Sequence, residues 1–336
     1  MPADKRECQS PHWIDPSPIR QPYPVSLILR PTETFFRDSL IVTSVIHCTD
    51  EVKWGLMLGV PMERPPELPD YGNPPLVEVV LGVQFEQLQG LGAVHYGYLW
   101  DAFREDFPRW EEKPPLAPAF ELPRSGGSPH MSVRVELGGA MLPRLWMVND
   151  NDTRLIQVQP DRLVVNWRKV GGDDVYPRYE AIREQFTAVV DKFSAFLAEQ
   201  ELDELRVNQC EITYINHIPV SDEADLWEKP EGLLKVFRPD DWDDPEAQLE
   251  DVQITLRHQL VNSDGQWVGR LVVQAQPAVV KNGQRVIALT ISARGRPLGH
   301  DLASVLEFMD WARMKIVQRF TSVTTPEMHQ IWQRTQ

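Results

Sequence analysis

Short stretches of alternating apolar and polar residues recur along the chain, and this alternation predicts β-strands. In residues 143–169 three apolar stretches are separated by two polar turns. The stretches are 145–147, 155–158 and 163–167, and the turns are 149–152 and 159–161. Asn, Asp and Pro favour the dihedral angles of turns, so the chain is expected to reverse direction at both. The pattern predicts an antiparallel meander of three strands.

Other parts of the chain predict further strands and helices by the same periodicity. Strands are expected at 76–85, 131–137, 207–218, 252–261, 267–276 and 286–294. Helices are expected at 95–110, at 176–200, at 230–237, after Asp301, and from Thr325-Pro326 to Trp332. Asp301 is the expected N-cap of the fourth of these helices, because its carboxylate can accept hydrogen bonds from first-turn amides.

The order of these elements predicts an α+β fold with two similar halves. A strand, a helix, further strands and a long helix follow one another in 74–200 and again in 206–333. We therefore expect each half to be an antiparallel sheet packed on a long helix. Residues 1–61, rich in Pro and Ser, are expected to be a poorly structured N-terminal extension, or to result from a wrong start if translation begins near Met62. A small docking segment at 40–46 is a third interpretation.

Charge and cysteine content exclude several classes of function. The net charge is −15, and 49 acidic residues face 34 basic ones, which argues against nucleic acid as a partner. No stretch approaches the roughly 20 apolar residues that span a bilayer. Cys8, Cys48 and Cys210 are far apart and odd in number, which favours a reduced, cytoplasmic protein.

A search for catalytic and cofactor motifs finds none. The chain has no GxGxxG after a strand, no GxxxxGK[ST], no HExxH and no GxSxG. Its eight histidines show no spacing typical of metal ligands. We predict no cofactor and no metal site, and the sequence leaves open whether the protein is an enzyme.

The strands of the second half carry polar residues at every other position, so each set points to one side of its strand. Aligned strands would join these sets into one face of amides, hydroxyls, two arginines and a carboxylate. The predicted ligand-binding residues are Gln209, Glu211, Thr213, Arg257, Gln274, Gln276 and Arg294. Such a face could bind a polar or anionic ligand, because arginine offers a planar fork of donors. The alternative is a solvated sheet face that binds nothing.

Two other groups of residues are weaker candidates for a site. Tyr214, Asn216 and His217 lie near a strand end, where His217 could act as a general base or serve a structural role. The acidic run 240–246 contains Trp242 and could bind a hard cation or a partner protein. It lacks the spacing of an EF-hand, so a solvated loop is the simpler interpretation.

From Pro74 onward the chain resembles a sporadically distributed family of bacterial proteins of unknown function. The resemblance is carried by PPLVEVVLGVQF at 74–85, RLWMVNDNDTRLIQVQPDRLVVNWRK at 144–169 and WARMKIVQRFTSVTTPEMHQIW at 311–332. It implies a bacterial, soluble, non-secreted protein and supplies no catalytic residue. It also implies a histidine at position 313, where this chain has Arg313.

The absence of an assembled catalytic motif predicts a non-catalytic binding or interaction module. Its partner would be a protein or a small polar ligand, bound at the polar sheet face or the acidic loop. The alternative is a hydrolase or ligand-processing enzyme that uses Glu211, His217, Arg257 and Arg294. The oligomeric state cannot be predicted from these patterns.

Overall fold

The computed structural model describes residues 64–123, 142–220, 226–238, 244, 246 and 249–335. The chain divides into two compact units, 1–58 and 59–336, and all described residues belong to the second. Three sequence predictions therefore lie outside the described residues. These are the N-terminal extension 1–61, the strand 131–137 and, apart from Asp244 and Glu246, the acidic run.

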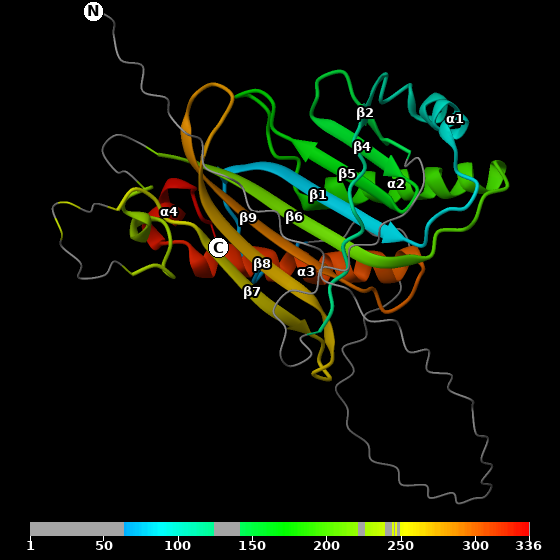
Figure 1. Ribbon diagram of the computed structural model, residues 1–336. Helices are drawn as coiled ribbons and strands as arrows, with labels where there is room; N and C mark the ends of the chain where they lie inside the picture. The colour runs from blue at the N-terminus through cyan, green and yellow to red at the C-terminus, as the bar shows by residue number, and fades with distance from the viewer. Residues whose placement is uncertain are drawn as a thin grey trace, which may run out of the picture. The chain divides into compact units, whose positions relative to one another are not determined.

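The described part of the chain is built on one nine-stranded sheet in which every neighbouring pair of strands is antiparallel (Figure 1). The strand order across the sheet is β2-β3-β4-β5-β1-β6-β9-β8-β7. The strands are β1 Leu76–Phe85, β2 Arg109–Lys113, β3 Arg144–Val148, β4 Arg154–Gln159, β5 Arg162–Arg168, β6 Val207–Pro219, β7 Ile254–Val261, β8 Trp267–Val279 and β9 Arg285–Gly295. The meander predicted from 143–169 is confirmed as β3, β4 and β5.

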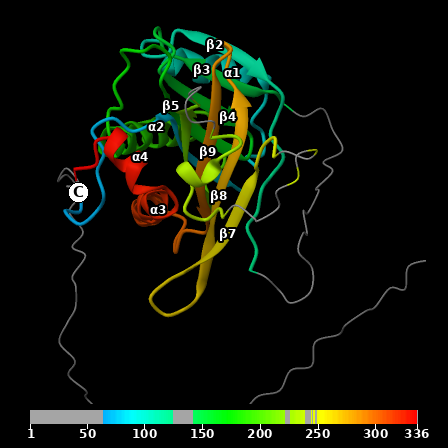
Figure 2. The same ribbon diagram turned by 90° about the vertical axis from the view of Figure 1, so that its left-hand side faces the viewer.

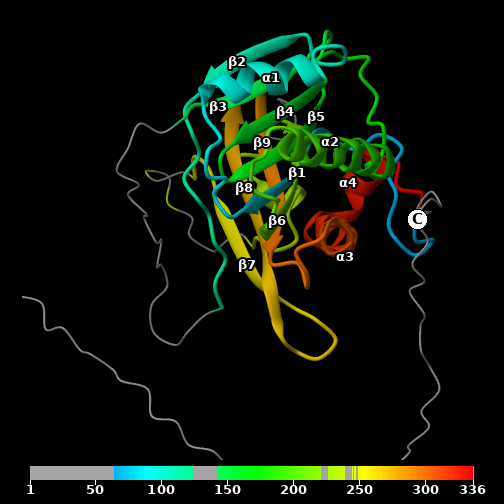
Figure 3. The same cartoon turned by 90° about the vertical axis from the view of Figure 1, so that its right-hand side faces the viewer.

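Two long helices cover one face of this sheet. The helices are α1 Ala93–Phe103, α2 Tyr179–Glu199, α3 Leu302–Val323 and α4 Pro326–Ile331, with a 3₁₀ turn at Pro230–Gly232. A side view shows α2 and α3 on the same side of the strands (Figure 3). Alternate strand residues such as Leu81, Ile212 and Ile291 are fully buried beneath them, together with Phe186 of α2 and Met309 of α3. The core therefore lies between the sheet and these two helices.

The prediction of two similar halves, each with its own sheet, is wrong. β1 and β6 pair with each other in the middle of the sheet, from Leu76 opposite Asn216 to Phe85 opposite Val207. The strands of 74–200 and of 206–333 therefore form a single continuous sheet. Periodicity tells which face of a strand is buried, but it does not tell which strand lies alongside it.

Two predicted helices were also too long. The helix expected at 95–110 ends at Phe103, and Arg109–Lys113 forms the edge strand β2 with Trp110 53% exposed. Pro108 explains the break, because proline cannot donate a backbone hydrogen bond and disfavours helical dihedrals in the residue before it. The helix expected at 230–237 is only the 3₁₀ turn. The predicted cap of α3 is confirmed, since the Asp301 carboxylate accepts a hydrogen bond from the Ser304 amide at 2.7 Å.

Candidate functional site

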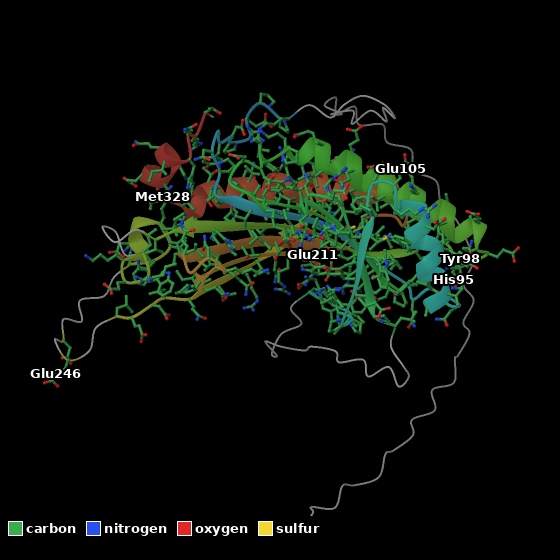
Figure 4. The ribbon with its side chains drawn as sticks, turned by 90° about the horizontal axis from the view of Figure 1, so that it is seen from above. His95, Tyr98, Glu105, Glu211, Glu246 and Met328 are labelled. Carbon is green, nitrogen blue, oxygen red and sulfur yellow. The ribbon has the colours of Figure 1, made fainter. Side chains whose placement is uncertain are left out.

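The polar residues predicted to share a sheet face do share one. Strand register places Glu211 opposite Arg294, Arg294 opposite Arg270, and Thr213 opposite Ser292, all on the face away from α2 and α3. Gln209, Arg257, Gln274, Gln276 and His217 follow the same alternation on β6, β7 and β8. Figure 4 shows Glu211 on the side of the sheet opposite the two helices. Ligand binding at this face stays a prediction.

Part of this polar face is covered by residues 114–123, which we call the crossing segment. It follows β2 and runs along the side of the sheet away from α2 and α3 (Figures 2 and 3). Leu116 exchanges two hydrogen bonds with the Gln159 amide group, at 3.0 and 2.9 Å. The Ala119 amide donates to Gln84 Oε1 at 2.9 Å, and the Glu121 amide donates to Gln209 Oε1 at 3.5 Å. Glutamines on this face therefore pair with the backbone of the crossing segment.

Four charged side chains fasten the end of the crossing segment to the sheet. Arg270 Nε donates to Glu121 Oε2 at 2.7 Å, and Arg294 Nη1 lies 3.6 Å from Glu121 Oε1. Arg294 also donates twice to Glu211 Oε2, at 3.0 and 2.8 Å. The donor fork of Arg294 and the carboxylate of Glu211 are thus already engaged by protein groups. This network has a clear structural role.

The other predicted site residues do not converge with this network. Arg257 is exposed on the edge strand β7, and Gln274 and Gln276 are exposed on its neighbour β8. His217 is half-buried near the end of β6, and burial lowers the pKa of its imidazole. Neither of the two cavities described below is lined by any of these four residues.

A small cavity lies on the opposite, helix-covered face, between α3, the start of β1 and the neighbouring parts of β6 and β9. We call it the Arg313 cavity, and its volume is about 50 Å³. This exceeds the roughly 10–15 Å³ that one water molecule needs. Its polar lining comprises Arg64, Asp70, Tyr71, Tyr176, Arg178, Tyr214, Asn216 and Arg313, and its apolar wall includes Leu76, Ile291, Ile316, Val317 and Phe320.

Arg313 is the most unusual residue of the cavity, because its side chain is charged and only 2% exposed. Its Nη2 donates to Glu180 Oε1 at 3.1 Å, and its guanidinium lies 5.1 Å from the centre of the Tyr179 ring. Its Nε has no hydrogen-bond partner among the described residues, and neither has the buried Nε of Arg64. Leaving a buried hydrogen-bond donor without a partner lowers the stability of a protein by about 1–3 kcal/mol. Both N–H groups therefore favour a hydrogen-bond acceptor in the cavity.

Two tyrosine hydroxyls add further polar groups to the cavity. Tyr176 Oη and Tyr214 Oη lie 3.3 Å apart. Burial raises the pKa of both hydroxyls, and for Tyr214 the neighbouring Arg313 partly offsets this effect. Both tyrosines therefore stay protonated at neutral pH, so their hydroxyls can donate hydrogen bonds as well as accept them.

The backbone around the cavity is irregular at two places. β1 carries a bulge between Leu76 and Glu78, where its pairing with β6 shifts by one residue. Arg178, at the N-cap of α2, has φ of 75° and ψ of 159°, a combination that costs a non-glycine residue on the order of 1–3 kcal/mol. The Arg178 side chain donates to Asp70 at 2.9 Å, which holds residue 178 at the rim of the cavity. Bulges and strained residues are frequent beside functional sites.

Sequence reasoning found only part of this cavity. Tyr214 and Asn216 belonged to a predicted candidate group, but the third member, His217, points to the other face of the sheet. Arg313 and Tyr176 were missed. A signal for Arg313 was present, because it interrupts the apolar stripe of α3 between Met309 and Ile316 at helical spacing.

A second cavity is larger, and its lining includes Gln185, whose buried Nε2 also has no hydrogen-bond partner among the described residues. It has a volume of about 450 Å³ and lies beside α1 and α2, where Phe103, Phe107 and Trp167 form much of its wall. Its two cations rest on aromatic rings, Lys192 at 4.8 Å from Phe103 and Arg154 at 5.6 Å from Phe107. We place the candidate site in the Arg313 cavity, because a guanidinium group that is only 2% exposed lines it and has an unpaired donor of its own.

Metal sites and membrane spans were sought only in the described ranges. There, no three His, Cys, Asp or Glu side chains are placed to hold a metal ion. No helix of the same residues is long and apolar enough to cross a membrane. In comparisons with known proteins, no family model matches this chain and no curated protein matches its sequence. The resemblance to a bacterial family therefore stays a prediction.

Proposed function

We propose that this protein is a non-catalytic binding protein that holds a small polar ligand in the Arg313 cavity. The observation that carries this proposal is the buried guanidinium of Arg313, whose Nε lacks a partner among the described residues. Buried polar groups in proteins are nearly always paired, so an unpaired donor beside a cavity favours a bound acceptor. The tyrosine hydroxyls beside it would hold such a ligand in one orientation.

The chemistry of the cavity supports binding rather than catalysis. Its described lining contains no Ser, Thr, Cys or His side chain that could serve as a nucleophile paired with a base. Its carboxylate, Asp70, lies 3.5 Å from Arg64 and 2.9 Å from Arg178. Cys210 lies on β6 but is buried, and burial raises the pKa of its thiol, which disfavours the reactive thiolate.

The proposal includes a cytoplasmic location and membership of the bacterial family named above. The unpaired, buried Cys210 and the odd number of cysteines support a reducing compartment. The family rests on the three sequence blocks that carry the resemblance.

Ligand-detected NMR on the full chain would test binding. Propionate, propionamide and 1-propanol serve as probes, because each joins a small polar group to the same short alkyl chain. We expect saturation transfer to at least one probe. We expect this transfer to disappear in Arg313→Met, which replaces the buried charge by an apolar chain of similar length.

Two further variants make the experiment decisive. Tyr98→Phe is the matched control, because Tyr98 is 58% exposed on α1 and lines neither cavity. Tyr214→Phe removes one cavity hydroxyl and serves if Arg313→Met fails to fold. Absence of transfer to all three probes would overturn the proposal, as would transfer that survives both cavity substitutions.

A further inference from the structure

The charges around the Arg313 cavity do not balance. Arg64, Arg178 and Arg313 supply three guanidinium groups, whereas Asp70 and Glu180 supply two carboxylates. Asp70 lies between Arg64 and Arg178, and Glu180 pairs with Arg313. Among the described residues that line the cavity or pair with its lining, one positive charge is therefore in excess, and Asn216 and the tyrosines add no charge to offset it.

The placement of α2 adds to this positive potential. Arg178 is the N-cap of α2 and lines the cavity, so the first turn of this 21-residue helix begins at the cavity rim. Unpaired amides at a helix N-terminus carry a partial positive charge. An anion in the cavity would thus interact favourably with both the guanidinium groups and the helix end.

The size and walls of the cavity restrict the kind of anion. A volume of about 50 Å³ admits only a small group, and Ile291, Ile316 and Val317 form an apolar wall beside the polar donors. One excess charge matches a monoanion, whereas phosphate groups carry close to two charges at neutral pH. Guanidinium groups pair well with the planar carboxylate, which can accept hydrogen bonds at both oxygens.

We propose that the ligand of the Arg313 cavity is a small aliphatic carboxylate, an inference that rests on the proposed function. Its carboxylate accepts hydrogen bonds from Arg313 Nε and from the tyrosine hydroxyls. Its alkyl part lies against the apolar residues of β9 and α3. Glu180, which already accepts from Arg313, competes with the ligand for the guanidinium and weakens its binding.

Calorimetric titration of the full chain at constant ionic strength tests the ligand class. The probes are propionate, its neutral isostere propionamide, and inorganic phosphate. We expect propionate to bind at least about tenfold more tightly than either, because hydrogen bonds to charged groups are the stronger ones. Equal binding of propionamide, or tighter binding of phosphate, would overturn the carboxylate inference and leave the binding function standing. If none of the three binds, the carboxylate inference falls, while the proposed function is judged separately by the NMR test with 1-propanol.

Glu180→Gln provides a readout that a merely structural role would not produce. Removing the competing carboxylate should tighten propionate binding by at least about twofold, whereas simple loss of structure would weaken it. Glu184→Gln is the matched control, because Glu184 is exposed one turn further along α2, and it should leave the affinity unchanged. Weaker propionate binding in a folded Glu180→Gln variant would contradict the proposed competition.

Discussion

Glu78 shows how a single carboxyl group is held in the polar face of the sheet. Its Oε1 accepts a hydrogen bond from the Asn166 amide at 2.6 Å, and Asn166 in turn accepts from Gln157 at 2.7 Å. Burial raises the pKa of the Glu78 carboxyl, and the Asn166 hydrogen bond and the charge of Arg168 partly offset the rise. The folded protein therefore favours the protonated form of Glu78 more than the unfolded chain does.

The raised pKa of Glu78 determines how this group makes the stability of the protein depend on pH. An acid with a raised folded pKa contributes stability at low pH and loses it as pH rises through the folded value. Glu78→Gln should therefore stabilise the protein more at about pH 7 than at about pH 4, because the amide needs no proton. Urea unfolding at both pH values gives the comparison. Glu105→Gln, at an exposed position, should show no such difference, and an equal effect of Glu78→Gln at both pH values would contradict the prediction.

At the scale of residues, the sequence predicted which face of the sheet a side chain occupies better than it predicted which side chains form the candidate site. The period of two placed Gln209, Glu211 and Arg294 on one face correctly, because alternation is a local property of a strand. Arg313 was missed because a charge inside an apolar helical stripe can be either buried or turned outward. Only the contacts with Glu180 and Tyr179, which are distant in the sequence, decide between these outcomes.

At the scale of elements, the crossing segment depends on a few side chains for its position. Arg270 holds its end through Glu121 and through the Leu122 carbonyl at 2.9 Å. Glu121→Gln should lower the free energy of unfolding by about 1–2 kcal/mol, because charged hydrogen bonds become neutral ones. It should also speed hydrogen exchange at the amides of Leu116, Ala119 and Glu121.

Hydrogen exchange read by mass spectrometry would locate this effect within the chain. The matched control is Glu111→Gln on β2, because Glu111 is more exposed and pairs with Lys113 at the surface. Exposed ion pairs contribute little to stability. This control should therefore leave the amides of the crossing segment protected from hydrogen exchange. Unchanged exchange at residues 114–122 in Glu121→Gln would show that Glu121 does not anchor the crossing segment.

The crossing segment was also the element least accessible to sequence reasoning. It contains no periodic pattern, and its hydrogen bonds go to glutamine side chains on β1, β4 and β6. Of these glutamines, only Gln209 was predicted to bind a ligand, because its backbone partner Glu121 is 88 positions away in the sequence. Apart from β2, the described strands and α2 were predictable because their apolar periodicity is continuous within each element.

At the scale of the whole molecule, one core connects the sheet with α2 and α3. Ile212 of β6 is fully buried in it, whereas Ile215 on the same strand is half-buried on the opposite face. Ile212→Ala should lower the free energy of unfolding by about 2–5 kcal/mol, because it removes buried methyl groups and leaves a cavity. Ile215→Ala should lower the free energy of unfolding by a smaller amount.

Urea unfolding followed by circular dichroism and by tryptophan fluorescence measures this prediction. Because the nine strands share one core, both signals should shift to the same lower midpoint in Ile212→Ala. Two separated transitions, with only one of them moved, would contradict a single cooperative unit. The pairing of β1 with β6 that creates this unit could not be predicted, because it joins segments more than 100 residues apart.

The crossing segment also constrains the order in which the chain can fold. Glu121 and its partner Arg270 are separated by 149 positions in the sequence. At typical rates of translation, Arg270 emerges from the ribosome on the order of ten seconds after Glu121. During synthesis the glutamines of β1 and β4 can already receive residues 114–119, but the acidic end must wait for β8 and β9. Docking of the acidic end is therefore a late event, and the Glu121 carboxylate of a nascent chain stalled before β8 lacks Arg270 and Arg294.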